Sequence, residues 1–146
     1  MSNGDAITHK ASGTLLKLSP LLARDTTLAL SNKLNLFKLF ILSILTYAAP
    51  VWSNTSFHNY RRLQIFQSKC LRVIGDYPRR TPIPYLHTSL NVPPIWNLIH
   101  HLTEKFFSRC LLYPSPLIQS ISIYTLADLH HQYNKYVHKR PKHILL

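Results

Sequence analysis

The sequence predicts an all-α protein: an irregular array of four to five helices with a proline-rich extended connector. Three observations support this fold class. Apolar residues recur at helical spacing, no segment alternates as a strand does, and 10 Pro against 3 Gly divide the chain into stiff pieces. The 146 residues correspond to one domain in length, and 46% apolar content is enough for a core.

Two helices are expected in the N-terminal part. The first covers residues 8–23, and Pro20 leaves the position of its end open. The second runs over about 28–48, with Thr26, Thr27 or Ser31 as the N-cap. Because its middle is apolar on nearly every side, it should be a central helix and the longest one.

The third helix, about 59–74, has the clearest division into two faces. Its apolar face carries Tyr60, Leu63, Phe66, Cys70, Val73 and Ile74. Its opposite face carries Arg61, Arg62, Lys69 and Arg72 within an arc of about 100°. Ile65 interrupts this basic arc, and Gly75 is placed to act as the C-cap.

The chain then divides at its prolines. Residues 77–94 contain five of the ten prolines and should form an extended surface connector. Helices over about 95–112 and 123–138 follow, the latter capped by Ser122 or Thr125. The expected organisation is a helical region at 8–76, the connector at 77–94, and a C-terminal helical region with a basic tail at 95–146.

Charge is the strongest indication of function. Seventeen Lys and Arg face 5 acids, which gives a net charge of +12. This excess favours a polyanionic partner, either nucleic acid or an anionic membrane. Nucleic acid is the better candidate, because no basic amphipathic anchor lies at a terminus and the apolar stretch at 39–51 is too short and interrupted for a membrane span.

The candidate binding residues extend from the basic helix face into the connector. Arg79 and Arg80 continue the basic arc, and Tyr60, Tyr77 and Tyr85 are candidate stacking partners near these cations. A solvated surface is the alternative interpretation of the same charges. For the basic tail at 138–143, disorder or a nuclear-localisation-like run is an equal alternative.

The two cysteines and the N-terminus suggest an intracellular location, in the nucleus or the cytoplasm. Cys70 and Cys110 form no metal-binding or disulfide framework, so we expect reduced thiols packed on apolar helix faces. The polar, acidic residues 1–6 do not resemble a secretory signal.

Catalytic and cofactor chemistry is not indicated. The acids are Asp5, Asp25, Asp76, Glu104 and Asp128, and no two of them are neighbours. Two-metal phosphoryl transfer requires paired carboxylates, so this chain alone should not polymerise DNA. Nine histidines lack the spacing of metal ligands, and three scattered glycines cannot form a phosphate loop, so we expect no metal and no cofactor.

Several blocks, taken in order, resemble a known family. Residues 28–38 read LALSNKLNLFK, 45–52 read LTYAAPVW, 63–74 read LQIFQSKCLRVI, 76–84 read DYPRRTPIP and 138–142 read HKRPK. This series resembles the region after the polymerase palm in jockey-type non-LTR (LINE-class) retrotransposon reverse transcriptases. The resemblance implies the C-terminal part of an RNA-directed DNA polymerase, beginning with the thumb.

The resemblance also implies partners and site residues. A thumb holds the template–primer duplex of RNA and DNA through backbone contacts, beside the polymerase palm and fingers. Lys33, Lys38 and the Arg61–Arg72 arc then become candidates for facing the duplex. Family members often have Gly where Ala48 stands and Pro where Ser43 stands, which implies a straighter helix end here.

Two other interpretations remain beside this one. The chain could be a standalone basic helical adaptor for an acidic protein or membrane surface, or a decayed element remnant without selected function. In either case Tyr47 and Trp52, at the end of an apolar helix, are expected to pack as aromatic anchors rather than form a ligand site.

Overall fold

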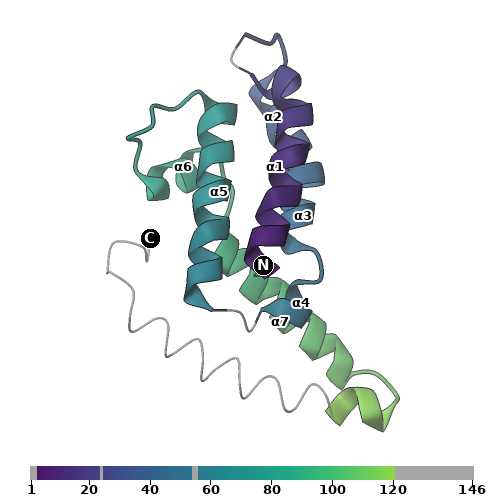
Figure 1. The fold of residues 1–146 in the computed structure, drawn as a ribbon. Coiled ribbons are helices and arrows are strands. Elements are labelled where there is room, and N and C mark those ends of the chain that lie inside the picture. Colours follow the sequence, from purple (N-terminus) through teal and green to yellow (C-terminus); the bar gives the residue numbers. More distant parts are fainter. Residues whose placement is uncertain (1–2, 24, 54–55, 121–146) are drawn as a thin grey trace.

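The computed structural model describes residues 3–23, 25–53 and 56–120, and within them every regular element is a helix (Figure 1). The predicted all-α fold class is therefore confirmed. The elements are α1 (Asn3–Leu22), α2 (Leu30–Leu36), the π-helical segment η1 (Phe37–Leu42), α3 (Ser43–Thr46), α4 (Ala49–Trp52), α5 (Phe57–Gly75), α6 (Ile83–Ser89) and α7 (Ile95–Leu111). The predicted helix at 123–138, with its caps Ser122 and Thr125 and the basic tail, lies outside the described residues.

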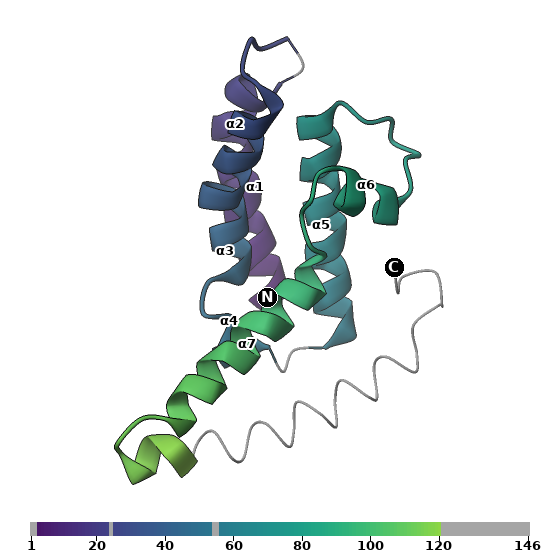
Figure 2. The same ribbon diagram turned by 180° about the vertical axis from the view of Figure 1, so that it is seen from behind.

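Three long rods run side by side and form the body of the fold. They are α1, the continuous series α2–η1–α3, and α5 (Figures 1 and 2). The series α2–η1–α3 is called the middle rod because it is the second in the chain, and it runs antiparallel to the other two. α1 packs against α5 and against η1 and α3, while α7 crosses one end and contacts α4 and α5. α5 is therefore covered by neighbours on one side and left open on another.

The predicted helix at 28–48 is present but is not one regular helix, and it is not the longest. α1 is longer, with 20 residues, and η1 interrupts the middle rod. Its buried residues recur every four positions: Lys33, Phe37, Ile41 and Leu45. In an ideal α-helix each step of four drifts by about 40°, so this row would turn away from the core. The wider π-helical turns of η1 compensate for this drift.

The middle rod also begins and ends differently from the prediction. α2 starts after Ala29, with no side-chain cap, whereas the Thr26 hydroxyl donates to the Ala23 carbonyl at 2.9 Å. At the other end Ala48 takes a left-handed conformation, with φ 52° and ψ 31°. The chain therefore turns between α3 and α4. The prediction of a straighter helix end at this position is wrong. Ala48 occupies a conformation that favours glycine.

α5 confirms the predicted helix and most of its two faces. Four of the six predicted apolar positions are buried, but Phe66 is half-buried and Val73 is exposed. The buried arc instead includes Gln67, Ser68 and Leu71, because α6, α7 and the turn before α7 also pack on this side of α5.

The C-cap of α5 is Asp76, which corrects the prediction of Gly75. Asp76 takes the left-handed conformation with φ 54°, and Gly75 is the last helical residue. A Cβ on Gly75 would lie 2.3 Å from the ring of Tyr77, so the glycine makes room for that ring.

The connector is not extended throughout, which corrects the prediction for 77–94. It contains the seven-residue helix α6, which buries Leu86 and His87. Two prolines are compatible with this helix because Pro82 is its N-cap and Pro84 lies in its first turn. In the first turn a missing N–H breaks no intrahelical hydrogen bond.

Candidate nucleic-acid interface

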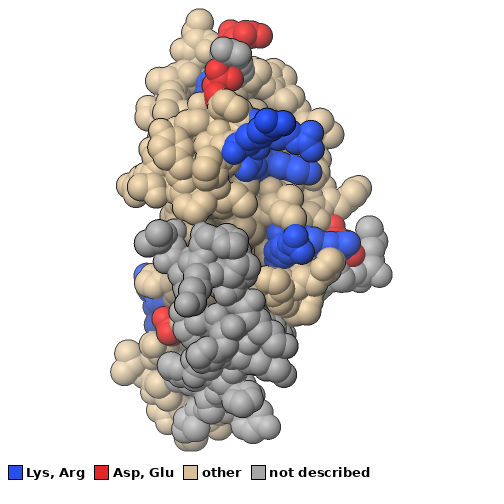
Figure 3. All heavy atoms as spheres, turned by 90° about the vertical axis from the view of Figure 1, so that its left-hand side faces the viewer, with Lys and Arg blue, Asp and Glu red and all other residues tan. Residues whose placement is uncertain are grey.

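The open side of α5 carries two exposed cations, Arg61 and Lys69. Within the described ranges neither has an ion-pair partner. Eight residues of α-helix separate them by about 12 Å along the axis. Figure 3 shows two larger, separate groups of Lys and Arg side chains toward one edge of the side formed by α5 and α6, and smaller ones beside acidic side chains elsewhere on this side.

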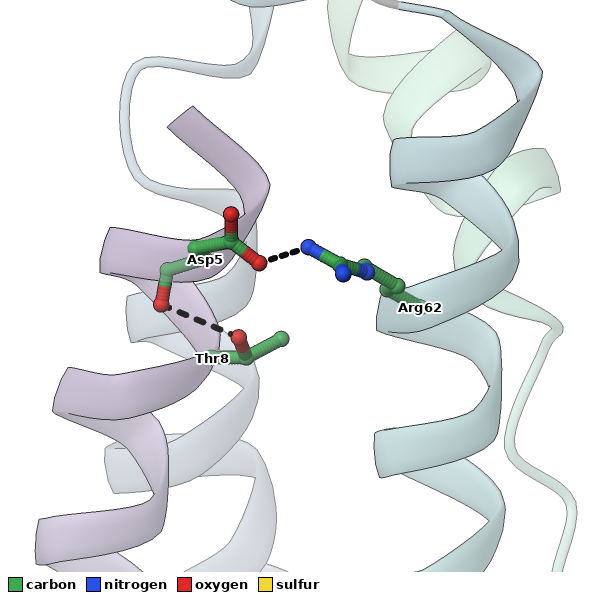
Figure 4. A network of polar contacts seen from close by, with 3 residues as sticks. All are labelled: Asp5, Thr8 and Arg62. Carbon is green, nitrogen blue, oxygen red and sulfur yellow. Dashed lines mark hydrogen bonds and ion pairs between the residues drawn. The ribbon is translucent and has the colours of Figure 1, made fainter. Parts of the chain in front are cut away.

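Arg62 lies at the edge of this face and joins α5 to α1. Its guanidinium pairs with the carboxylate of Asp5, whose backbone carbonyl accepts the Thr8 hydroxyl at 3.1 Å (Figure 4). Both partners are partly exposed, so the ion pair contributes little to stability. The pair does neutralise the charge of Arg62, which the sequence analysis counted among the cations available to a polyanion.

Arg72 turns toward the protein and is half-buried. One guanidinium nitrogen, Nη2, donates to the Thr81 carbonyl at 3.1 Å. The buried Nε has no hydrogen-bond partner among the described residues. Arg72 therefore positions the chain between α5 and α6 instead of presenting its charge to solvent.

The two lysines of the middle rod differ. Lys33 is only 7% exposed, and its ammonium donates to the Ala23 carbonyl at 2.7 Å. Lys38, on η1, is exposed. Lys33 belongs to the row of buried residues described above, so we remove it from the candidate interface and retain Lys38.

Arg79 and Arg80 occupy the two central positions of a turn. The Thr81 N–H donates to the Pro78 carbonyl at 3.0 Å, and both arginines are exposed at the tip. A hydrogen-bonded turn holds its central residues out from the body of the fold. Arg79 and Arg80 therefore stay candidate binding residues as two exposed cations, and the turn that carries them was not predicted.

The three candidate stacking tyrosines have different environments. Tyr60 is buried: its ring centroid lies 4.3 Å from that of Trp96, and its hydroxyl donates to the Ser53 carbonyl at 2.5 Å. Tyr77 is half-buried against Gly75. Tyr85 is 56% exposed. Only Tyr85 offers a largely open ring.

A buried polar cluster was not anticipated from the sequence. The Gln64 side chain accepts the Ile95 N–H at 3.1 Å and lies 2.8 Å from His87 Nε2, while Gln67 donates to the Pro93 carbonyl at 3.0 Å. His87 Nδ1 lies 2.8 Å from the Val92 carbonyl. These contacts hold the turn before α7, and burial lowers the pKa of His87 below its usual value.

The remaining reactive side chains have structural environments. Cys70 is a buried free thiol whose pKa is raised by burial to about 12, and Cys110 is a half-buried free thiol. His100 and Glu104 lie 3.5 Å apart on α7. Across residues 3–23, 25–53 and 56–120 no three His, Cys, Asp or Glu side chains are grouped to hold a metal ion. No helix in these ranges is long and apolar enough to cross a membrane.

Comparison with known proteins supports the resemblance noted in the sequence. No family model and no solved structure matches the chain. Among curated proteins, it is 25% identical over 118 residues to the "RNA-directed DNA polymerase from mobile element jockey" of Drosophila funebris. The chain is similar to part of a jockey-type RNA-directed DNA polymerase. The Drosophila melanogaster proteins "Probable RNA-directed DNA polymerase from transposon BS" and the jockey polymerase are 27% and 24% identical over 104 and 105 residues.

The matches cover most of this chain and a small part of each relative. The three alignments cover 81%, 71% and 72% of the chain but 13%, 12% and 12% of the relatives. The chain thus spans about an eighth of the length of these polymerases. The inferred resemblance to jockey-type retrotransposon polymerases is confirmed at this level.

Proposed function

We propose that the chain is a thumb-like segment of a retrotransposon RNA-directed DNA polymerase and binds the backbone of an RNA–DNA template–primer duplex. The observation that carries the proposal is the open, basic face of α5, with Arg61 and Lys69 exposed on one rigid helix. Lys38, Arg79 and Arg80 are further exposed cations, and Arg62 contributes less because Asp5 neutralises it.

Simple dimensions support phosphate contact by this face. The separation of about 12 Å between Arg61 and Lys69 corresponds to three or four nucleotides of one strand, at about 3.4 Å per nucleotide. Arginine and lysine side chains on phosphates fix the position of a protein on a duplex but do not read its sequence. The proposed role is therefore positioning, with little sequence preference.

The proposed contribution is non-catalytic. No two of the five acids are adjacent in the sequence, and the polymerase activity named for the relatives belongs to proteins of which this chain matches about an eighth. We expect the purified chain to give no primer extension with Mg²⁺ and a template–primer. Extension by a preparation free of other polymerases would contradict this expectation.

The binding test compares two variants that lose the same charge. Arg61→Gln/Lys69→Gln removes the α5 cations, and Lys10→Gln/Lys17→Gln removes two exposed lysines from α1. RNA–DNA duplex affinity is measured over a range of salt concentrations. The α5 variant should reduce the slope of log K against log salt by about 1.8, because each lost phosphate contact accounts for roughly 0.9.

The control variant decides between a localised face and general charge. The Lys10→Gln/Lys17→Gln protein should keep most of the wild-type slope. Equal slopes in all three proteins would reject the α5 face as a duplex site. Binding to vesicles of anionic lipid without any binding to duplex would favour the adaptor alternative instead.

A further inference from the structure

The loop between α5 and α6 carries two exposed arginines, and the first turn of α6 carries an exposed aromatic ring. This link, residues 76–82, projects from the edge of the helical body (Figures 1 and 2). Arg79 and Arg80 lie at its tip, and Tyr85 lies just beyond it in the first turn of α6. None of these three residues belongs to the α5 face.

The loop is held at several independent points. Its turn is closed by the hydrogen bond between the Thr81 N–H and the Pro78 carbonyl, and Arg72 donates to the Thr81 carbonyl from α5. Tyr77 packs over Gly75, and its hydroxyl donates to Ser89 Oγ at 3.0 Å, which joins the start of the loop to the end of α6. The loop is therefore preorganised, which reduces the entropy lost when a ligand binds.

The Tyr85 ring is fixed without being covered. Its centroid lies 5.9 Å from that of Tyr77, and the two ring planes meet at 87°. A T-shaped contact of this kind uses at most one face of the Tyr85 ring, and the side chain stays 56% exposed. A planar group can therefore stack on the open face of this ring.

The surrounding charge identifies the class of planar group. The loop carries Asp76 at its start and Arg79 and Arg80 at its tip, and residues 77–94 contain no acid. An exposed aromatic ring five and six residues after two exposed cations matches a nucleotide, whose base stacks while its phosphate contacts arginine. Bases within a duplex are stacked on each other, so only an unpaired base has a face free for Tyr85.

We propose that Tyr85, Arg79 and Arg80 form a second site that binds an unpaired nucleotide of single-stranded RNA or DNA. This inference shares with the proposed function only the premise that the chain binds nucleic acid. In a polymerase the site would hold a single-stranded segment next to the duplex on α5. Base identity should matter little, because every base has an aromatic face.

The test uses a fluorescein-labelled oligo-uridine and a labelled RNA–DNA duplex, with full-length chains. Tyr85→Ala should weaken oligo-uridine binding about 5- to 150-fold, which corresponds to about 1–3 kcal/mol for one stacked base. Duplex affinity should change less than twofold. Tyr85→Phe keeps the aromatic ring and should bind both ligands as the wild type does.

Two further variants serve as controls. One tests whether loss of binding reflects loss of folding, and the other tests whether any exposed tyrosine ring contributes to binding. Tyr85→Leu retains apolar volume against Tyr77 but offers no aromatic face, so it should lose oligo-uridine affinity as Tyr85→Ala does. Tyr47→Ala removes a 79% exposed tyrosine on another part of the surface and should leave both affinities unchanged. A helical circular dichroism spectrum equal to that of the wild type verifies folding of each variant.

The outcomes distinguish this inference from the proposed function. Wild-type oligo-uridine affinity in folded Tyr85→Leu, or an equal loss for oligo-uridine and duplex, would overturn the second site. Loss of oligo-uridine binding in Tyr85→Leu, together with an unchanged salt slope in Arg61→Gln/Lys69→Gln, would support the second site and reject the α5 duplex face. An oligonucleotide containing 2-aminopurine should also show fluorescence quenching with wild type and Tyr85→Phe, but not with Tyr85→Leu.

Discussion

The indole N–H of Trp52 donates a hydrogen bond to the backbone carbonyl of Tyr47 at 2.7 Å. The bond joins the end of α3 to α4 across the left-handed residue Ala48. The Trp52 ring is only 9% exposed, and its centroid lies 6.3 Å from that of Tyr60, whereas the Tyr47 side chain is 79% exposed. The two aromatic residues therefore do different things: Trp52 is the packing anchor that the sequence predicted, and Tyr47 contributes its backbone.

Replacing Trp52 by alanine should destabilise the fold strongly. Trp52→Ala removes a buried ring and leaves the Tyr47 carbonyl without its donor, so we expect a loss of about 3–5 kcal/mol in the free energy of unfolding. Chemical denaturation followed by helical circular dichroism measures this loss. Tyr47→Ala keeps the carbonyl and should cost less than about 0.5 kcal/mol, as exposed positions usually do. Similar losses in the two variants would show that the ring of Trp52 is not the anchor.

Ala48→Gly should stabilise the protein. An alanine in the left-handed region costs about 1–2 kcal/mol, which the glycine variant regains. The unfolded chain of the glycine variant is more flexible, and its extra entropy lowers this gain by about 0.4–1 kcal/mol. The expected net gain is about 0.5–1 kcal/mol in urea denaturation. Ala6→Gly, at an exposed position inside α1, is the matched control and should lose about 0.5–1 kcal/mol. A loss of stability in both variants would mean that Ala48 is not strained.

The helices were predictable from the sequence because their apolar residues and prolines divide the chain clearly. α5 and α7 begin and end within about two residues of the expected positions, and α5 exposes Arg61 and Lys69 as its basic arc predicts. The interruption by η1 was not predicted. The feature that marks it is the row Lys33, Phe37, Ile41 and Leu45, whose spacing of four also identifies Lys33 as an inward residue.

Other features depend on contacts between segments far apart in the chain. The helical period places Arg72 among the exposed cations, yet the Thr81 carbonyl draws its guanidinium inward. Gln67 is polar but buried, because the Pro93 carbonyl accepts its side-chain N–H. α6 was missed because a count of prolines does not show that Pro82 and Pro84 lie at the start of a helix.

Stability should fall as the pH is lowered through the range where histidine titrates. Burial lowers the pKa of His87 in the folded protein below the usual value of 6.5. The unfolded chain therefore binds a proton near pH 6.5 that the folded protein does not, and the stability present above this pH is lost as the pH falls below it. Protonation would also put donors on both sides of the Gln64–His87 contact.

His87→Leu measures this dependence. The variant should be less stable at pH 7.5, because Gln64 loses a partner, but its free energy of unfolding should change less than that of the wild type between pH 7.5 and 5.5. His101→Leu, at an exposed position on α7, should keep the wild-type pH dependence. If His87→Leu and the wild type lose equal stability over this range, protonation of His87 is not the cause.

Arg72 and Lys69 allow a direct comparison between a positioning cation and a binding cation on one helix. Arg72→Gln removes the charged hydrogen bond to the Thr81 carbonyl and should cost about 1.5–3 kcal/mol in unfolding free energy. Lys69→Gln, at an exposed position, should change stability by less than about 0.5 kcal/mol. Denaturation of the two variants under the same conditions measures this difference.

Duplex binding should be affected in the opposite order to stability: Lys69→Gln should change it and Arg72→Gln should not. Lys69→Gln should lower the salt slope for the RNA–DNA duplex by about 0.9, because it removes one phosphate contact, and should leave oligo-uridine affinity unchanged. Arg72→Gln should leave the duplex slope unchanged, since its guanidinium is half-buried and donates to the Thr81 carbonyl. It should weaken oligo-uridine binding, because the turn that carries Arg79 and Arg80 loses its attachment to α5. A reduced duplex slope in Arg72→Gln, with stability unchanged, would return Arg72 to the duplex interface and contradict its assignment as a positioning residue.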